Sequence, residues 1–297
     1  MYHLPVLLNE SINGLNIKPD GLYVDVTYGG GGHSAEILKK LESGHLYGFD
    51  QDKDAEANIP DDEHFTFIPQ NFKYLKNFLS LYGAKKVDGI FADLGVSSHQ
   101  FDVADKGFST RFEGRLDMRM DQNNPMSASL IVNSYSEENL AVILANYGEL
   151  QNARRMAKSI VFARNIKPIN TTFELKEAIK SLLPKFKENK VLAQLFQALR
   201  IEVNQEMQVL EAFLSQCADL LNPGGRLVVL SYHSLEDRMV KNFLRSGNVK
   251  GEIEKDFFGN NLSPYELISR KAIVASDDEI SRNSRSRSAR LRIAERK

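Results

Sequence analysis

The sequence predicts an α/β protein built on a doubly wound parallel sheet, and three observations support this. Short apolar segments alternate with helical patterns over the first 98 residues, as is typical of a parallel sheet covered by helices on both faces. Four consecutive glycines, residues 29–32, separate the first apolar segment from a helical pattern. Near the end of the chain, residues 289–294 alternate polar and apolar side chains with the period of a strand.

The first part of the chain contains four predicted strands and two predicted helices. We expect the strands at 22–27, 45–49, 65–68 and 87–92, and the helices at about 33–42 and 72–82. In a doubly wound sheet, the turns at the carboxyl ends of such strands form the ligand-binding edge.

After Gln100 the alternation stops. Residues 101–126 are polar and show no strand pattern. Helical patterns follow at 137–147, 152–165, 173–183 and 191–221, and Thr171 and Glu174 form a capping box before the third. The strand pattern resumes at 226–230, after the turn at 222–225. We therefore expect one sheet domain, residues 1–103 and 201–297, interrupted by an inserted helical domain, residues 104–200.

The composition of the 297 residues is that of an ordinary globular protein, with 42% hydrophobic and 26% charged residues. The single cysteine, Cys217, excludes an internal disulfide framework and a thiolate metal cluster. No apolar run approaches the roughly 18 residues of a membrane span, and the first residues lack a signal-peptide pattern. We expect a cytoplasmic protein that makes no membrane contact.

The charge is distributed unevenly. Residues 281–297 carry seven basic residues and one acidic residue, a local balance of +6, so the other 280 residues sum to −7. Such a basic segment on an acidic protein favours contact with a polyanion. A charge run alone is more often a solvated tail, but the strand period within this one predicts that it belongs to the sheet.

The glycine turn predicts a ligand, because glycine tolerates positive φ and lets a ligand approach the main chain. Gly30, Gly32 and Ala35 fit the dinucleotide fingerprint, and Asp50 ends the second strand, where a carboxylate can bind ribose hydroxyls. This pattern alone leaves NAD, FAD and S-adenosylmethionine as alternatives.

Asp93 ends the fourth strand, beside the point where the strand order reverses. A carboxylate there suits a cationic sulfonium or an amine acceptor better than a pyrophosphate. The alternative is that Asp93 only caps the following helix.

Six ordered motifs resemble the ribosomal RNA small-subunit methyltransferase H (MraW) family. They are residues 25–34, 93–98, 116–121, 196–201, 231–238 and 285–290. The resemblance implies a class I S-adenosylmethionine-dependent methyltransferase, with a Rossmann-like doubly wound sheet and an inserted helical domain. It also implies methylation of the exocyclic N4 of one cytidine in the decoding region of bacterial 16S rRNA, with the small ribosomal subunit as partner. A homodimer is a separate candidate assembly.

The resemblance also implies site residues. Cofactor contacts fall on Gly31, Gly32, His33, Asp50, Phe72, Asp93 and Gln100. Without the resemblance, Phe72 would be a core aromatic and His33 a solvent-facing helix residue. No metal is implied.

For the chemistry we expect Asp93, or the main-chain oxygens after it, to polarise the acceptor amine, and Tyr232 to stack on the unstacked base. His233 is a weaker candidate for RNA contact or proton removal, and an orienting role is equally expected. RNA phosphates are expected to meet Arg111, Arg115, Arg119, Arg154, Arg155 and the arginines of 282–292.

The family pattern differs from this sequence at His99, Arg115 and Tyr232, where it has proline, proline and phenylalanine. None of these differences alters the expected activity. Three alternatives remain: a nicotinamide oxidoreductase, a DNA amino-methyltransferase, and a non-catalytic ribosome-assembly factor. The DNA enzymes typically carry a Pro-Pro-aromatic motif after strand four, which residues 93–96 lack.

Overall fold

The computed structural model describes residues 5–297 and divides into two compact units. Unit 1 comprises residues up to Gly95 and from Met207 onward, and unit 2 comprises Val96–Glu206. The insertion expected at 104–200 falls within unit 2. Each unit is described by itself.

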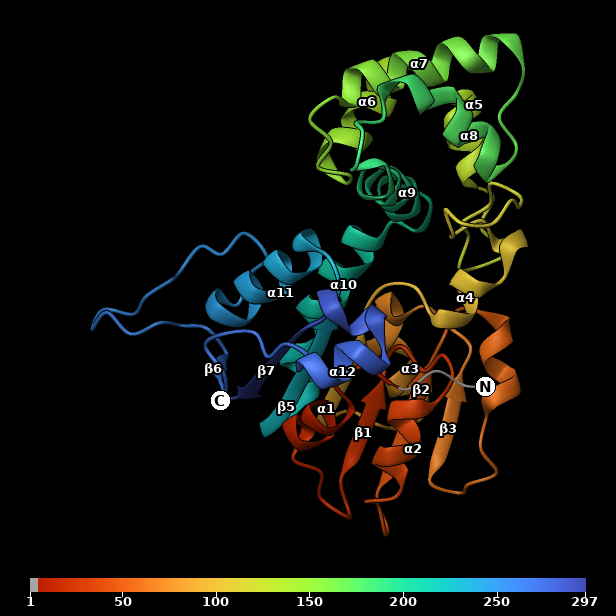
Figure 1. The fold of residues 1–297 in the computed structure, drawn as a ribbon. Helices are drawn as coiled ribbons and strands as arrows, with labels where there is room; N and C mark the ends of the chain where they lie inside the picture. Colours follow the sequence, from red (N-terminus) through yellow and green to blue (C-terminus); the bar gives the residue numbers. More distant parts are fainter. Residues whose placement is uncertain (1–4) are drawn as a thin grey trace. The chain divides into compact units, whose positions relative to one another are not determined.

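Unit 1 contains a seven-stranded sheet in the order β3-β2-β1-β4-β5-β7-β6 (Figure 1). The strands are β1 Leu22–Asp25, β2 His45–Phe49, β3 Phe65–Ile68, β4 Val87–Asp93, β5 Leu221–Ser231, β6 Tyr265–Leu267 and β7 Arg290–Arg296. The first five are parallel, and β7 runs antiparallel to both β5 and β6. The predicted parallel sheet is confirmed. Of the basic segment 281–297, residues Arg290–Arg296 lie in the sheet as β7, whereas Ser284–Ser288 form a 3₁₀ turn outside it.

Helices cover both faces of this sheet (Figure 1). They are α1 Leu8–Leu15, α2 Gly32–Leu38, α3 Leu75–Leu81, α10 Glu206–Leu220, α11 Ser234–Ser246 and α12 Asp277–Arg282. Alternate strand residues enter separate cores. Val24, Ile90 and Val229 pack with residues of α3, α10 and α11, while Tyr23, Phe91 and Val228 pack with residues of α1 and α2. Both faces are therefore apolar, as a parallel sheet requires.

The turn expected at 222–225 lies within β5 as an irregularity. Leu221 pairs with Val87, and the register then shifts so that Arg226 pairs with Gly89. Gly224 has a φ of 77° and accommodates the extra residues. The regular part of β5 then leads to Ser231 at the carboxyl edge of the sheet.

Unit 2 is helical. Its helices are α4 Ser98–Asp102, α5 Ala128–Ser134, α6 Glu137–Asn146, α7 Ala153–Ile166, α8 Thr172–Ile179 and α9 Glu188–Asn204. They enclose their own apolar core, which includes Met156, Leu175 and Leu195. The capping box of Thr171 and Glu174 is present at the start of α8 and confirms that prediction.

The predicted single helix over 191–221 is wrong, because the chain forms α9 and α10 with a break at Gln205. Gln205 is left-handed, with a φ of 50°. Asn204 is held just before it: its side chain accepts from the main-chain N–H of Met120 at 2.9 Å and donates to the carbonyl of Met118 at 2.8 Å. These long-range contacts within unit 2 end α9, so the local pattern could not reveal the break.

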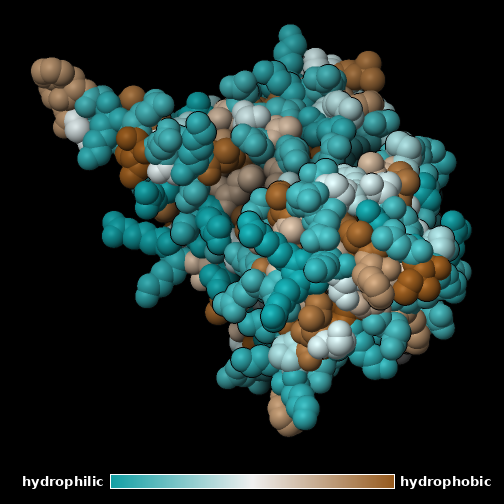
Figure 2. Space-filling model, turned by 90° about the horizontal axis from the view of Figure 1, so that it is seen from above, coloured by the Kyte–Doolittle hydropathy of each residue, from teal (hydrophilic) through white to brown (hydrophobic). Residues whose placement is uncertain are grey.

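Five short 3₁₀ segments complete the described chain: η1 Lys53–Asn58, η2 Phe72–Tyr74, η3 Ala104–Lys106, η4 Lys180–Leu182 and η5 Ser284–Ser288. Polar side chains dominate the face seen in Figure 2, while the projecting arm at the left ends in apolar residues. Two exposed aromatics of unit 1, Phe257 and Phe258, lie in the long segment between α11 and β6. None of the helices in residues 5–297 combines the length and apolar character that a bilayer crossing requires.

Candidate cofactor site at the strand ends

The glycine turn between β1 and α2 is shaped by close contacts inside unit 1. Gly29 and Gly31 have φ values of 50° and 73°. A Cβ on Gly31 would lie 2.7 Å from the Tyr28 hydroxyl oxygen, and one on Gly32 would lie 2.5 Å from Pro5 Cγ. Glycine is therefore required at both positions by the fold of the turn itself, as well as for the ligand approach that the sequence predicted.

Asp25 anchors this turn and was absent from the predicted site. Its side chain accepts from the Ser34 hydroxyl at 2.7 Å and from the main-chain N–H of Thr27 at 3.0 Å. Burial raises the pKa of Asp25, and the hydrogen bond from Ser34 opposes the shift. The signal that identified Asp50 and Asp93, an acid at the end of a strand, also applied to Asp25 at the end of β1.

Asp50 lies directly after β2 and faces the same turn. Its Oδ2 accepts from the main-chain N–H of Gly29 at 2.8 Å, and its Oδ1 accepts from that of Asp52 at 2.8 Å. Burial raises its pKa to about 6, although both hydrogen bonds lower it. Each carboxylate oxygen can accept a second hydrogen bond, so Asp50 retains the capacity to bind a ribose diol.

Phe72 begins η2, just after β3. Its ring packs edge-on against Phe213 with centroids 5.3 Å apart, and the residue is only half-buried. The preceding Asn71 donates to Gln51 Oε1 at 2.7 Å and so links the loops after β3 and β2. One edge of the Phe72 ring thus belongs to the core, and the remainder can contact a ligand.

Asp93 ends β4 and is held from three sides. Its main-chain N–H donates to the Thr27 hydroxyl at 2.6 Å, its Oδ1 accepts from the Tyr232 hydroxyl at 2.7 Å, and its Oδ2 lies 3.9 Å from His33 Nδ1. About a quarter of the side chain, 26%, is exposed. Burial raises the Asp93 pKa to about 7; the Tyr232 hydrogen bond lowers it and the charge of Glu236 raises it. This carboxyl group can therefore change protonation near neutral pH.

His33 lies in the first turn of α2 and is buried, so the solvent-facing alternative is wrong. Its Nε2 lies 3.1 Å from the carbonyl oxygen of Val6. Burial lowers the His33 pKa, opposed by the charge of Asp25. A neutral ring that donates through Nε2 presents the lone pair of Nδ1 toward Asp93.

Tyr232 follows β5 and positions the carboxylate of Asp93 through its hydroxyl. Burial and the charge of Asp93 raise the Tyr232 pKa, so the phenol remains a donor. Gly95 lies against the ring: a Cβ at this residue would be 3.6 Å from Tyr232 Cδ2. The sequence indicated an aromatic face here but not this hydrogen bond.

His233 is the N-cap of α11. Its Nδ1 accepts from the main-chain N–H of Glu236 at 3.4 Å, and the Glu236 carboxylate in turn accepts from the main-chain N–H of His233 at 3.3 Å. His233 thus caps α11, and its part in the reaction stays a prediction.

Gln100 is the one predicted cofactor residue in unit 2. It is buried in α4, where its Oε1 accepts from the main-chain N–H of Ser97 at 3.1 Å and completes a capping box. The other predicted cofactor residues, Gly31, Gly32, His33, Asp50, Phe72 and Asp93, all lie in unit 1.

The predicted phosphate-binding arginines divide into two groups, and Arg285, which is only partly exposed, belongs to neither. Arg119 and Arg292 form bidentate ion pairs with Asp117 and Asp237, respectively, so each of these two arginine charges is neutralised by a carboxylate of the protein. Exposed residues form the second group: Arg111, Arg115, Arg154, Arg155, Arg282, Arg287 and Arg290.

The fold and this site define a class of protein. A sheet that reverses its order between β1 and β4 binds ligands at the carboxyl ends of those strands. Here that edge carries the glycine turn, the carboxylate of Asp50 after β2 and the carboxylate of Asp93 at the switch point. Together with the antiparallel β7, this is a class I S-adenosylmethionine-dependent methyltransferase.

The chain belongs to the MraW methylase family, whose model matches residues 1–297. This confirms the resemblance found in the sequence. The chain is 58% identical to the ribosomal RNA small subunit methyltransferase H of Phocaeicola vulgatus, covering 100% of this chain and 98% of the relative. It is also 58% identical to the protein of that name from Bacteroides thetaiotaomicron, with 100% and 98% covered. Among solved structures, an rRNA methylase from Streptococcus thermophilus aligns over 97% of this chain and 93% of its own, with a TM-score of 0.43 and 11% identity.

Proposed function

We propose that this protein transfers a methyl group from S-adenosylmethionine to the exocyclic N4 of a cytidine in the decoding region of 16S rRNA. The observation that carries the proposal is Asp93, a partly exposed carboxylate at the switch point, held by Tyr232 and Thr27 beside the glycine turn. Full-length relatives named for small-subunit rRNA methylation support the choice of substrate.

The cofactor would be held by residues that retain hydrogen-bonding capacity. Asp50 would accept from the ribose hydroxyls, Phe72 would pack against the adenine, and the main chain of Gly31 and Gly32 would lie under the methionine part. Gln100 would contribute from unit 2. When bound, S-adenosylmethionine supplies a methyl carbon made electrophilic by its sulfonium.

Asp93 would act on the amine. The N4 lone pair of cytosine is delocalised into the ring, so the amine must be oriented as the new bond forms. Asp93 would accept a hydrogen bond from N4–H and would then take the proton that the alkylated nitrogen releases. Tyr232 would hold the carboxylate in place. Stacking of the base on its ring, and any proton transfer by His233, stay predictions.

The RNA would be held by basic side chains on both units. We propose that unit 2 recognises the substrate through its exposed arginines, Arg111, Arg115, Arg154 and Arg155. The substrate is part of a ribosomal subunit, so we also propose a cytoplasmic location. A homodimer stays a proposal, tested by the molar mass in solution.

A methyl-transfer assay tests the function. Small subunits from cells that lack this protein should accept a labelled methyl group, and mapping should place it on a cytidine N4. Asp93→Ala should abolish transfer, because the amine loses its acceptor, while an exposed control, Asp61→Ala, should retain it.

Near-normal transfer by Asp93→Ala at saturating cofactor would remove this residue from the mechanism. Calorimetry separates the other classes: heat with NAD and none with S-adenosylmethionine would indicate an oxidoreductase. Binding of rRNA without any methyl transfer would indicate an assembly factor.

A further inference from the structure

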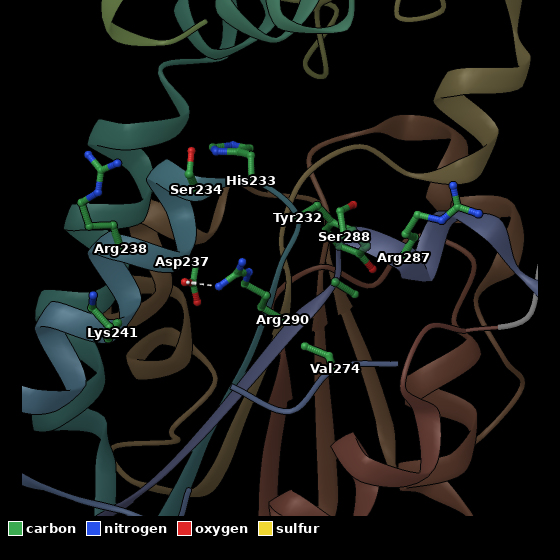
Figure 3. A pocket seen from close by; sticks show the side chains of 11 residues that line it. Tyr232, His233, Ser234, Asp237, Arg238, Lys241, Val274, Arg287, Ser288 and Arg290 are labelled. Carbon is green, nitrogen blue, oxygen red and sulfur yellow. Dashed lines mark hydrogen bonds and ion pairs between the residues drawn. The ribbon is translucent and has the colours of Figure 1, made fainter. Parts of the chain in front are cut away.

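A pocket of about 420 Å³ opens in unit 1 between the start of α11 and the segment that leads into β7 (Figure 3). Tyr232 and His233 contribute to its wall, and most of its other lining residues are charged or bear a hydroxyl group. Apart from Tyr232 and His233, the lining residues have no role at the reacting amine in the proposed mechanism.

The charge of this pocket is strongly positive. Four of its lining residues are cationic, Arg238 and Lys241 on α11 and Arg287 and Arg290 at η5 and β7, whereas one, Asp237, is anionic. All four cations are exposed. An open pocket with cations on both sides suits an anion that presents several oxygens.

Asp237 does not cancel this charge, because Arg292 already neutralises it. Arg292 donates to both carboxylate oxygens of Asp237, at 2.7 and 3.1 Å, and its side chain is only 11% exposed. Arg290 makes a longer contact with Asp237 at 3.4 Å and keeps 56% of its side chain exposed (Figure 3). Arg292 is therefore the main countercharge of Asp237, and the charge of Arg290 stays largely accessible in the pocket.

The pocket adjoins the candidate active site. Tyr232 contributes to its wall and donates its hydroxyl proton to the hydrogen bond with Asp93. An anion bound here would thus lie next to the place proposed for the target base. The hydroxyl-bearing Ser234 and Ser288 also line the pocket and can complement phosphate oxygens.

We propose that this pocket binds backbone phosphates of the RNA strand that flanks the target nucleotide. The inference rests on the proposed function. A base must leave its stack to reach an enzyme's reacting groups, and phosphate contacts close to that base offset the cost and fix the register of the strand. Cations arranged on two sides of an open pocket match a polyanionic strand better than a single small anion.

The test removes three of the four exposed cations of the pocket and leaves the bidentate pair of Arg292 and Asp237 in place. The variant Lys241→Gln/Arg287→Gln/Arg290→Gln retains Arg292 and removes exposed side chains only. A matched control, Lys18→Gln/Lys40→Gln/Lys85→Gln, removes the same charge from exposed lysines at the amino edge of the sheet. Binding to a decoding-region fragment of 16S rRNA is measured from low to moderate salt, and S-adenosylhomocysteine binding is measured by calorimetry to verify the fold.

The pocket variant should bind the RNA at least tenfold more weakly at about 0.1 M salt, and its slope of log affinity against log salt should fall by roughly one for each phosphate that the pocket no longer neutralises. Its cofactor affinity should equal that of the wild type, and the control should bind RNA like the wild type. Equal RNA affinity and salt slope in the pocket variant and the control would overturn the inference. Binding of inorganic phosphate to the wild-type pocket, with RNA binding unchanged in the pocket variant, would also overturn it. Absence of methyl transfer by the wild type itself would instead contradict the proposed function.

Discussion

At the scale of single residues, the candidate site contains carboxyl groups whose burial disfavours the ionised form. Asp25, Asp50 and Asp93 end three adjacent parallel strands, and burial raises the pKa of each. A buried anion without a full countercharge costs stability. In the proposed mechanism, Asp50 and Asp93 supply the acceptors for a ribose diol and an amine.

Removing the charge of Asp93 should therefore stabilise the ligand-free protein. The folded pKa of about 7 lies above the ordinary 3.8, so the folded state binds the proton more tightly than the unfolded state. The contribution of Asp93 to the stability of the wild type then falls as the pH rises from about 4 to about 7. Asp93→Asn can still accept a hydrogen bond from Tyr232. At pH 8 its free energy of unfolding, measured by urea titration, should exceed that of the wild type by up to about 4 kcal/mol. At pH 4 the two proteins should differ little.

The pH dependence distinguishes this explanation from general repacking. A constant difference between Asp93→Asn and the wild type at both pH values would contradict it. Asp61→Asn, at an exposed position, provides the control and should leave stability nearly unchanged at either pH.

At the scale of elements, the junction between α9 and α10 shows how long-range contacts override a local pattern. The residues on either side continue an apolar helical period, yet Gln205 is left-handed. Arg200 and Glu206 span the break through a bidentate ion pair, with both distances 2.8 Å. The ion pair and the contacts of Asn204 stabilise a conformation that glutamine alone does not favour.

Gln205→Gly should relieve this strain, because glycine adopts positive φ without a Cβ clash. We expect the free energy of unfolding to rise by about 0.5–1 kcal/mol in urea titrations, since the gain in the folded state exceeds the entropy added to the unfolded chain. Gln205→Ala, which shortens the side chain but keeps Cβ, should change little. A destabilised glycine variant would show that the side chain of Gln205 matters more than its backbone.

At the scale of the whole molecule, the predicted cofactor residues are distributed unequally between the two units. Unit 1 contains all of them except Gln100, which lies in α4 of unit 2 and already serves a capping box. The assignment of Gln100 to the cofactor site is therefore a prediction separate from that of the unit 1 residues.

Hydrogen exchange with S-adenosylhomocysteine tests this assignment. Bound ligand should slow amide exchange at residues 27–34, 50–52, 70–74 and 93–95, because these loops form the proposed site. If Gln100 is a contact, protection should extend to residues 97–102 and not to α5–α8. Protection of the unit 1 loops alone would remove Gln100 from the site, and uniform protection of both units would indicate general stabilisation instead.

Much of this protein follows from the sequence by itself, because local rules determine it. Apolar periodicity identified the parallel strands and the C-terminal strand, whose antiparallel direction only the structure shows. Acids that follow strands pointed to Asp50 and Asp93. The helix α1, the short strand β6 and the break at Gln205 had no comparable local signal. These depend on packing and on hydrogen bonds between distant residues.

Only the tertiary structure decided which charged and aromatic side chains are available for chemistry. Arg292 and Asp237 are 55 positions apart, and their bidentate pairing leaves Arg290 only a longer contact with Asp237, at 3.4 Å. Tyr232 and Asp93 are 139 positions apart, and their hydrogen bond shows that Tyr232 positions a carboxylate, while stacking on a base stays a prediction. A pattern read along the chain reports neighbours in sequence, whereas burial and ion pairing depend on neighbours in space.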